Sequence, residues 1–307
     1  MNILILIINI FFSTIYSKEY IWPNDHQGKI TANFCEPRFR RFHAGMDVRT
    51  FGEIGSNLYA IESGTIHRIK ISPNNYGKAV YLKLNDGNII LYSHLNKFNE
   101  EIESLIKKLH NEYQSSFFDH FLNSEQKIII NKGDIIGYTG DTGSLTGPHL
   151  HFEIRNENDE PLNPLEFYKL PDSTSPIVNS IIFIPLNENA WIDGIQDYKN
   201  IEFEKINTNK YVIQDTISVS GEFGIAVETF DKIDNLSFKY GVYKIEVLLN
   251  NILIYKVEFD NYNFSEDYLI YTVIDYDLLQ NGQISHRLFK QNNSDLSFIK
   301  SINNGRI

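Results

Sequence analysis

The sequence predicts a mainly β protein in which an antiparallel sheet domain is followed by an immunoglobulin-like β-sandwich. Three observations lead to this prediction. The chain has 307 residues, enough for two domains that each bury a core. Short β-like runs separated by Gly, Asn, Asp and Pro recur along most of it. Residues 170–176 contain two prolines and small polar residues, which is typical of a linker between domains.

The first element is the N-terminal segment 1–17, which carries no charge and contains an apolar run over residues 3–12. This layout predicts a secretory signal peptide. Two features depart from the usual pattern, because no Lys or Arg precedes the run and Ile15 stands where a small residue is common before a cut after Ser17. A retained anchor is the alternative, but the run is about half of the ~20 residues that a membrane span needs. We therefore expect an exported protein with no integral membrane domain beyond this signal.

The first domain is expected over residues 18–170. Its strands are expected where apolar and polar residues alternate between turn residues. These runs are residues 57–63, 64–71, 78–84, 88–93 and 150–155. Between residues 97 and 127 the apolar side chains recur instead at steps of three and four, which is a helical period. We interpret this segment as a helical insertion in the sheet domain.

The second domain is expected over residues 171–307. Strands are predicted at residues 177–185, 216–229, 243–259 and 268–279. Their alternation and spacing favour an immunoglobulin-like β-sandwich. We expect this domain to be a non-catalytic accessory module that binds an envelope partner. Whether it is complete at residue 307 stays open.

Composition narrows the classes of function. Lys and Arg total 28 against 39 Asp and Glu, a formal charge of −11, which argues against nucleic acid as a partner. The same charge favours a periplasmic setting over a wall rich in anionic polymer. The single cysteine, Cys35, allows no internal disulfide and no Cys-rich zinc site. Any metal must therefore be held by the nine histidines and the carboxylates.

The motif that carries most information is the segment 147–154, with the sequence GPHLHFEI. Alternate side chains of a strand share one face, so His149, His151 and Glu153 are expected together, opposite the apolar residues between them. The apolar face should pack on a core, which leaves the histidines facing a groove or solvent. Taken alone, such a pair of histidines is more often an ordinary feature of an exposed strand than a metal site.

Two earlier motifs make a metal site the favoured interpretation. His43 and Asp47 enclose the tripeptide Ala-Gly-Met, and His94 follows an expected strand in the sequence LYSHL. Together the three motifs supply two imidazoles and one carboxylate for a metal, plus two further histidines. Three protein ligands and one open position are what catalytic zinc sites use.

These strings resemble the lysostaphin-type (LytM-like) peptidoglycan zinc endopeptidases. The resemblance rests on FHAGMDVRT at residues 42–50, YSHL at 92–95, and the run from GDIIG to PHLHFE at 133–153, which occur in family order. It covers most of residues 28–168. The lead-in to the first string and the helical insertion resemble a subgroup found in envelope proteins of Bacteroidetes-like bacteria.

The resemblance implies a role for each motif residue. His43, Asp47 and His151 are expected to hold one Zn²⁺ per chain, while His94 and His149 are expected to be the catalytic histidines that do not bind the metal. Which of the two acts as the base stays open. The implied function is hydrolysis of peptide bonds in the stems or cross-links of peptidoglycan, in the periplasm or cell envelope of a bacterium. The sequence does not reveal which bond is cut.

Other functions fit the sequence less well than this one. A catalytically inactive relative that binds wall or activates another hydrolase is the main alternative, and an adhesin with a spacer domain is a further one. The chain has no His-Glu-x-x-His motif, and its glycine-rich segment 140–147 lacks the Gly-Lys ending of a phosphate loop. A Cys35 nucleophile would leave the complete set of zinc-type ligands unexplained.

Overall fold

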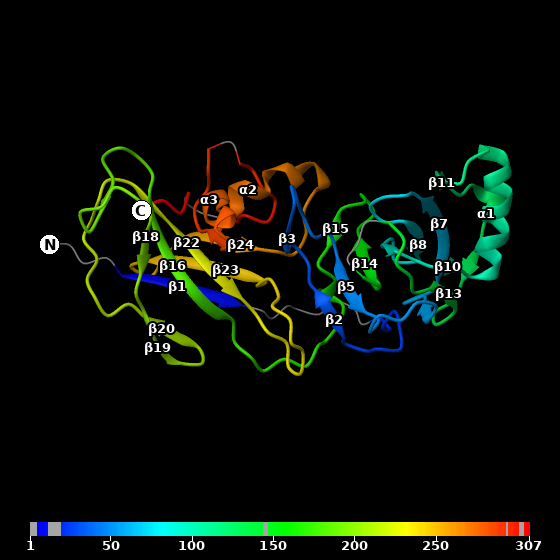
Figure 1. Cartoon of the computed structure of the whole chain (residues 1–307), viewed down its shortest axis with the longest axis horizontal. Helices are drawn as coiled ribbons and strands as arrows, with labels where there is room; N and C mark the ends of the chain where they lie inside the picture. The colour runs from blue at the N-terminus through cyan, green and yellow to red at the C-terminus, as the bar shows by residue number, and fades with distance from the viewer. Residues whose placement is uncertain (1–4, 12–19, 144–146, 293, 301–303) are drawn as a thin grey trace. The chain divides into compact units, whose positions relative to one another are not determined.

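The computed structural model describes residues 5–11, 20–143, 147–292, 294–300 and 304–307 of the chain. It is mainly β with antiparallel sheets, which confirms the predicted fold class (Figure 1). The chain divides into two compact units. The sheet unit comprises Ile15–Phe34 and Ala44–Leu170, and the C-terminal unit comprises Met1–Thr14, Cys35–His43 and Pro171–Ile307. The division after Leu170 coincides with the start of the expected linker.

The sheet unit is built on a nine-stranded antiparallel sheet. Seven strands follow the order β11-β7-β8-β9-β14-β5-β2, while β12 pairs with β7 and β15 pairs with β14. The strands are β2 (Ile30–Ala32), β5 (Met46–Arg49), β7 (Gly64–Ile71), β8 (Lys78–Leu84), β9 (Ile89–Ser93), β11 (Phe118–Phe121), β12 (Ile129–Ile130), β14 (His149–Arg155) and β15 (Pro161–Leu162). A smaller sheet contains β6 (Asn57–Tyr59), β10 (Lys97–Phe98) and β13 (Ile135–Tyr138). The short turn η2 (Pro164–Glu166) follows β15.

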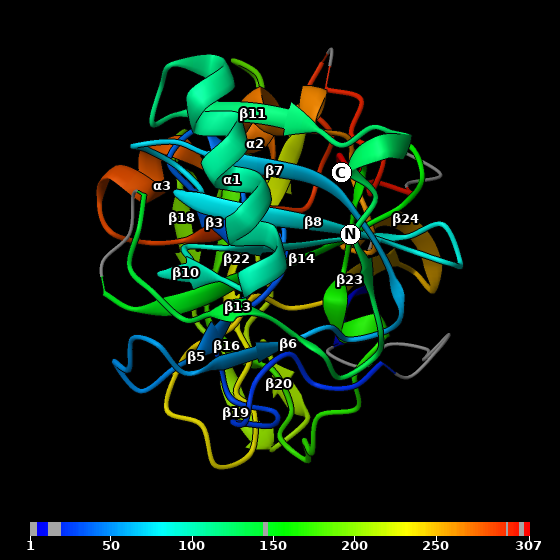
Figure 2. The ribbon, with the colours of Figure 1, turned by 90° about the vertical axis from the view of Figure 1, so that its right-hand side faces the viewer.

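One helix of this unit lies inside the range where a helical insertion is predicted. Helix α1 (Glu100–Tyr113) begins after Asn99, whose side chain accepts a hydrogen bond from the Ile102 N–H at 2.9 Å. Its buried residues are Ile102, Ile106 and Leu109. Figure 2 shows α1 in front of strands β11, β7 and β8.

The predicted helical range is too long at its C-terminal end. After α1 the chain forms β11, which pairs with β7, and the short turn η1 (Ser124–Gln126). The helix ends because Gln114 has a left-handed backbone with φ 49°. Phe118 then joins the sheet opposite Ile71 and is buried. The segment is therefore part of the sheet and is not a detachable insertion.

The C-terminal unit contains several antiparallel sheets. A four-stranded sheet has the order β18-β16-β22-β25, a three-stranded sheet has the order β1-β23-β24, and the described residues form three further strand pairs. The strands are β1 (Leu6–Phe11), β3 (Pro37–Arg38), β4 (Arg41–Phe42), β16 (Ile177–Pro185), β17 (Trp191–Ile192), β18 (Lys199–Ile201), β19 (Glu204–Asn207), β20 (Lys210–Val212), β21 (Val219–Ser220), β22 (Phe223–Phe230), β23 (Lys244–Leu249), β24 (Ile252–Glu258) and β25 (Ser285–Arg287). That these sheets form an immunoglobulin-like sandwich stays a prediction.

The strand expected at residues 268–279 is wrong, because this segment is helical. It contains the end of η3 (Phe264–Leu269), then α2 (Ile270–Val273) and most of α3 (Tyr276–Gln280). Two polar side chains start these turns. Asn263 forms a capping box with Glu266, and Asp275 accepts a hydrogen bond from the Leu278 N–H at 3.0 Å. The buried side chains of Ile270, Val273 and Ile274 recur at helical steps, which explains why the turns pack well.

The predicted export signal falls partly outside the described residues, which omit 1–4 and 12–17. Its described part, Leu6–Phe11, forms β1 and pairs antiparallel with β23. Export and cleavage stay predictions. None of the helices in the described ranges is long and apolar enough to cross a membrane.

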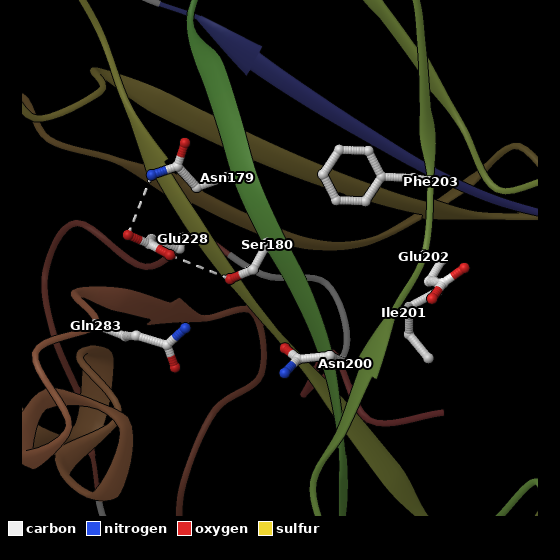
Figure 3. Close-up of a pocket in the computed structure, with 8 residues that line it drawn as sticks. All are labelled: Asn179, Ser180, Asn200, Ile201, Glu202, Phe203, Glu228 and Gln283. Atoms are coloured by element: carbon white, nitrogen blue, oxygen red, sulfur yellow. Dashed lines mark hydrogen bonds between the residues drawn. The ribbon is translucent and has the colours of Figure 1, made fainter.

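An open hollow of about 490 Å³ lies on the C-terminal unit (Figure 3). At its wall, Glu228 accepts hydrogen bonds from the Asn179 amide at 3.2 Å and the Ser180 hydroxyl at 3.3 Å. The other lining residues are Asn200, Ile201, Glu202, Phe203 and Gln283. These residues include no histidine, lysine or arginine, so the hollow offers no cationic binding group and no imidazole base beside the Ser180 hydroxyl.

Candidate metal centre

Strand β14 brings the sequence motifs together because it lies between β5 and β9. In the register of the sheet, His151 is opposite Asp47 on one side and Ser93 on the other. The strand alternates as predicted, since Leu150, Phe152 and Ile154 are fully buried in the core. The side chains of the two histidines therefore project from the opposite face, beside the end of β9 where His94 follows.

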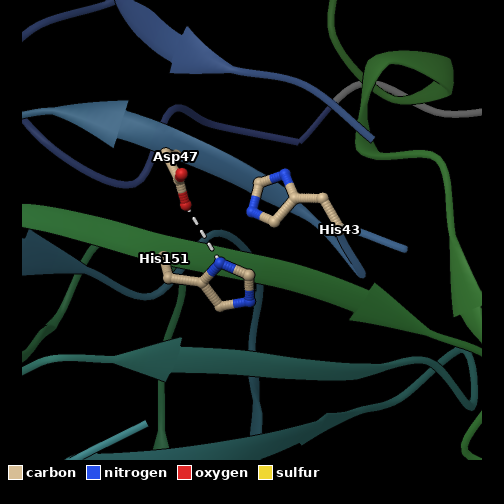
Figure 4. A group of neighbouring side chains, drawn as sticks. All are labelled: His43, Asp47 and His151. Atoms are coloured by element: carbon tan, nitrogen blue, oxygen red, sulfur yellow. Dashed lines mark hydrogen bonds and ion pairs between the residues drawn. The ribbon is translucent and has the colours of Figure 1, made fainter. Parts of the chain in front are cut away.

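Three predicted ligands form one cluster. His43, Asp47 and His151 each offer a ligand atom, and these atoms all lie within 4.8 Å of one another (Figure 4). The Asp47 Oδ1 atom is 3.0 Å from Nδ1 of His151. Both histidines are buried, and Asp47 is partly buried. Two imidazoles and one carboxylate at such short separations can hold a divalent transition metal.

The backbone of His43 is fixed by the hairpin of β3 and β4. Its N–H donates to the Glu36 carbonyl at 2.9 Å, and its carbonyl accepts from the Cys35 N–H at 2.8 Å. The preceding Phe42 is buried, and its N–H donates to Asp267 Oδ1 at 3.0 Å. The Phe42 ring also makes edge contacts with two aromatic rings of the same unit, those of Tyr262 and Phe298. The first ligand therefore follows a well-anchored turn.

Close packing of the backbone brings the next motif residue to the sheet. Gly45 lies so close to β14 that an added Cβ would be 2.1 Å from the Phe152 carbonyl oxygen. A side chain at this position would push β5 away from β14. The glycine in the tripeptide between His43 and Asp47 therefore has a steric cause.

The two remaining predicted histidines lie beside the cluster. The rings of His94 and His149 have centroids 4.9 Å apart, and those of His94 and His151 are 6.0 Å apart. His149 Nε2 is 3.6 Å from Asp47 Oδ1. The structure thus brings all five predicted site residues into one neighbourhood.

His94 is held in an unusual conformation. Its backbone has φ 62°, a left-handed value that is strained for a residue other than glycine. Its Nδ1 lies 2.8 Å from the Thr142 carbonyl oxygen, which can only accept, so Nδ1 carries the proton and Nε2 is the basic atom. Burial, assisted by the neighbouring His151, lowers the pKa of His94 to about 4, so the ring is neutral at pH 7.

Two residues of the site were not assigned a role from the sequence. Glu153 is fully buried and accepts hydrogen bonds from His151 Nε2 at 2.8 Å, the Tyr76 hydroxyl at 2.6 Å and Arg155 Nε at 2.7 Å. The alternation of the motif already placed Glu153 on the histidine face. Tyr76 lies in a turn, and no sequence pattern connects it to β14; in the structure its ring stacks on His151 at 5.6 Å.

The charges of Glu153 and His151 stabilise one another. Burial alone would raise the pKa of Glu153, but Arg155 and the hydrogen bonds from His151 and Tyr76 lower it to about 2. Burial alone would lower the pKa of His151, but its hydrogen bonds to Asp47 and Glu153 raise it to about 9. Without a metal the ring is therefore protonated at pH 7. A bound cation would replace that proton between the ring and Asp47.

The alternative nucleophile is unfavourable. Cys35 is buried, and burial together with nearby carboxylates raises the pKa of its thiol well above the ordinary value. A thiol in this state is not a reactive thiolate at neutral pH.

Comparisons with known proteins find similarity to part of the chain. Residues 99–164, a range that contains His149 and His151, match the family model described as Peptidase family M23. The DD-carboxypeptidase/endopeptidase Mpg of Neisseria meningitidis is 30% identical over 125 residues, which are 41% of this chain and 22% of that protein. Lysostaphin of Staphylococcus staphylolyticus is 32% identical over 114 residues, which are 36% of this chain and 18% of that protein.

A solved structure of Helicobacter pylori Csd3 is 25% identical and covers 51% of this chain and 36% of that chain, with a TM-score of 0.36. The aligned part of the present chain spans less than a quarter of the meningococcal relative and of lysostaphin.

Proposed function

Because the chain contains a peptidase family M23 domain, we propose that it is an exported zinc metalloendopeptidase that hydrolyses peptide bonds in the stems or cross-links of peptidoglycan. The observation that carries this proposal is the cluster of His43, Asp47 and His151 with His94 and His149 beside it. The relatives' names support the reaction class, since they describe a carboxypeptidase/endopeptidase and a glycyl-glycine endopeptidase. The charge-free apolar segment at residues 1–17 and the formal charge of −11 are the basis for placing this protein in the periplasm or cell envelope.

The donor set of the cluster fits zinc. His43 and His151 would supply nitrogen and Asp47 oxygen, three protein ligands of the kind that catalytic zinc sites use with one position left for water or substrate. When bound there, zinc would lower the pKa of a water molecule towards ~7 and polarise the carbonyl of the peptide bond.

The chain's own residues would manage the protons. His94 is neutral and its basic Nε2 atom is defined by the Thr142 contact at Nδ1, so we assign it the role of accepting the proton from the attacking water. The same atom can then deliver the proton to the leaving amine. His149 has Nδ1 2.9 Å from the Gly147 carbonyl, which orients the ring beside Asp47. We propose that it hydrogen-bonds to the reacting group.

The proposal is tested by metal analysis and by products. The purified protein should contain close to one zinc per chain, and His43→Ala, Asp47→Ala and His151→Ala should each lose it. His94→Ala should keep the metal and lose turnover by about 10²–10⁴-fold, the usual contribution of general acid–base catalysis. Mass spectrometry of fragments from purified sacculi would identify the bond.

Full zinc binding without any fragment release would instead support the main alternative, an inactive wall-binding protein or an activator of another hydrolase. In either case we propose that the C-terminal unit is an accessory module for an envelope partner.

A further inference from the structure

We propose that Glu153 is a positioning residue that makes Nδ1 of His151 the metal-binding atom. This inference rests on the proposed metal site and adds a residue that the five predicted ones do not include. Glu153 contacts Nε2 of His151, whereas Nδ1 of the same ring lies beside Asp47. It acts through the ring of His151, two residues earlier on the same face of β14.

Two carboxylates compete for the ring of His151. Nδ1 of His151 lies 3.0 Å from Asp47 Oδ1, and Nε2 lies 2.8 Å from Glu153 Oε1. A neutral imidazole has a single N–H, so only one of these contacts can be a hydrogen bond from a neutral ring. If Nδ1 carried the proton, it would point its hydrogen at Asp47 and could not bind the metal that Asp47 shares.

Glu153 is well placed to accept the single N–H of the neutral His151 ring. Its side chain is fully buried, so it depends on protein donors for its hydrogen bonds. Tyr76 donates to the same Oε1 atom at 2.6 Å, and Arg155 donates to Oε2 at 2.7 Å. Arg155 supplies the compensating positive charge at a buried position. Three donors thus hold the Glu153 carboxylate in place beside Nε2 of His151.

The orientation of the His151 ring is also restrained. Tyr76 stacks on His151 with an angle of 29° between the rings. Its hydroxyl also lies 3.3 Å from Arg155 Nη2, so the tyrosine connects both partners of Glu153. A carboxylate behind a ligand histidine raises the basicity of the ligand and orients it, and its loss typically lowers metal affinity 10–100-fold.

The test compares substitutions on the two sides of Arg155. Glu153→Gln keeps the shape and removes the charge that holds the proton at Nε2. Asp159→Asn is the matched control, because Asp159 pairs with Arg155 Nη1 at 2.9 Å and is exposed. The measurements are the zinc affinity of the full chain, by competition with a chromogenic chelator, and ¹⁵N NMR of the histidine rings with zinc bound.

We expect Glu153→Gln to weaken zinc binding 10–100-fold and Asp159→Asn to leave it within about twofold. In the zinc-loaded wild type, the NMR spectrum should show the proton of His151 on Nε2 and the metal on Nδ1. Equal zinc affinity of Glu153→Gln and wild type, or zinc on Nε2, would overturn the inference while leaving the metal site intact. A wild type that binds no zinc would overturn the proposed function and the inference with it.

A second substitution guards against misfolding of Glu153→Gln. Tyr76→Phe retains the stacked ring and the carboxylate but removes one hydrogen bond to Oε1. We expect it to fold and to weaken zinc binding about three- to tenfold, a smaller loss of the kind that follows from one weakened partner. Zinc binding unchanged by Tyr76→Phe would refute the network as a positioning device.

Discussion

Gly45→Ala is the substitution that tests the geometry of the metal centre most severely. The added methyl would lie 2.1 Å from the Phe152 carbonyl oxygen and 2.8 Å from Glu153 Cγ, whereas real Cβ contacts essentially never fall below 3.0 Å. β5 must therefore move by about 0.9 Å or more relative to β14. Because metal–ligand distances tolerate only about ±0.2 Å, Asp47 and His151 could no longer bind one ion well.

The expected magnitudes separate stability from metal binding. Overpacking of this kind costs about 1–3 kcal/mol of unfolding free energy. Gly64→Ala is the matched control, since its added Cβ would lie 2.3 Å from the Lys83 carbonyl oxygen, the same kind of clash between neighbouring strands but on β7 and β8. Urea unfolding should show similar losses for both variants.

Zinc affinity should then distinguish the two variants. We expect Gly45→Ala to bind zinc at least tenfold more weakly, about 1.4 kcal/mol, and Gly64→Ala to bind it like the wild type. Affinity is measured by competition with a chromogenic chelator on folded protein. Wild-type affinity in Gly45→Ala would refute the claim that the close approach of β5 and β14 sets the ligand geometry.

Three further predictions concern stability and the anchoring of His43. Burial lowers the pKa of His286 to about 4, below that of an unfolded histidine, so the unfolded chain binds a proton first and stability falls as pH falls below 6.5. At pH 4.5, His286→Phe should remove about 2–3 kcal/mol of this acid-induced loss of unfolding free energy. Urea unfolding at two pH values measures the effect, and a pH dependence equal to that of the wild type would contradict it. Asp267→Ala should leave the N–H of Phe42 without its carboxylate acceptor, cost about 1–3 kcal/mol of stability and weaken zinc binding. Asp267→Asn, which keeps an acceptor oxygen, should restore both the stability and the zinc affinity. Equal zinc affinities of Asp267→Ala and the wild type would exclude anchoring of His43 by this contact. Removing zinc with a chelator should lower the melting temperature, since free zinc at 100 times Kd adds about 2.7 kcal/mol to stability, and His151→Ala should melt at one temperature with or without chelator.

The proximity of the candidate side chains was largely predictable because β14 obeys a local rule. Alternation along a strand depends only on backbone geometry, so the common face of His149, His151 and Glu153 could be inferred before any partner strand was known. The motif strings then supplied His43, Asp47 and His94. What the alternation could not give was the use of Glu153, because its role depends on Tyr76 and Arg155 converging on it in space.

Both wrongly predicted segments depend on residues that start or end a helix. At residues 268–279 the apolar residues suit a strand or short helical turns equally well, and the capping side chains of Asn263 and Asp275 decide the outcome. At residues 114–127 the helical period ends at Gln114, where the backbone turns left-handed.

The grouping of residues 35–43 with the C-terminal unit depends on contacts with residues more than 200 positions away. Phe42 reaches Tyr262 and Phe298 in this way. Local sequence patterns do not predict contacts at such a separation. The grouping of this segment apart from residues 18–170 was therefore not predictable.

The measurement that tests the central claim most directly is the release of new amino groups from purified sacculi. The zinc-loaded chain is incubated with sacculi, and free α-amino groups are labelled and counted over time, with His151→Ala and a chelator-treated sample as controls. A zinc-dependent peptidase predicts amino groups that increase with time in the wild type and stay at background in both controls. A wild type that holds one zinc per chain and releases no amino groups would contradict the account.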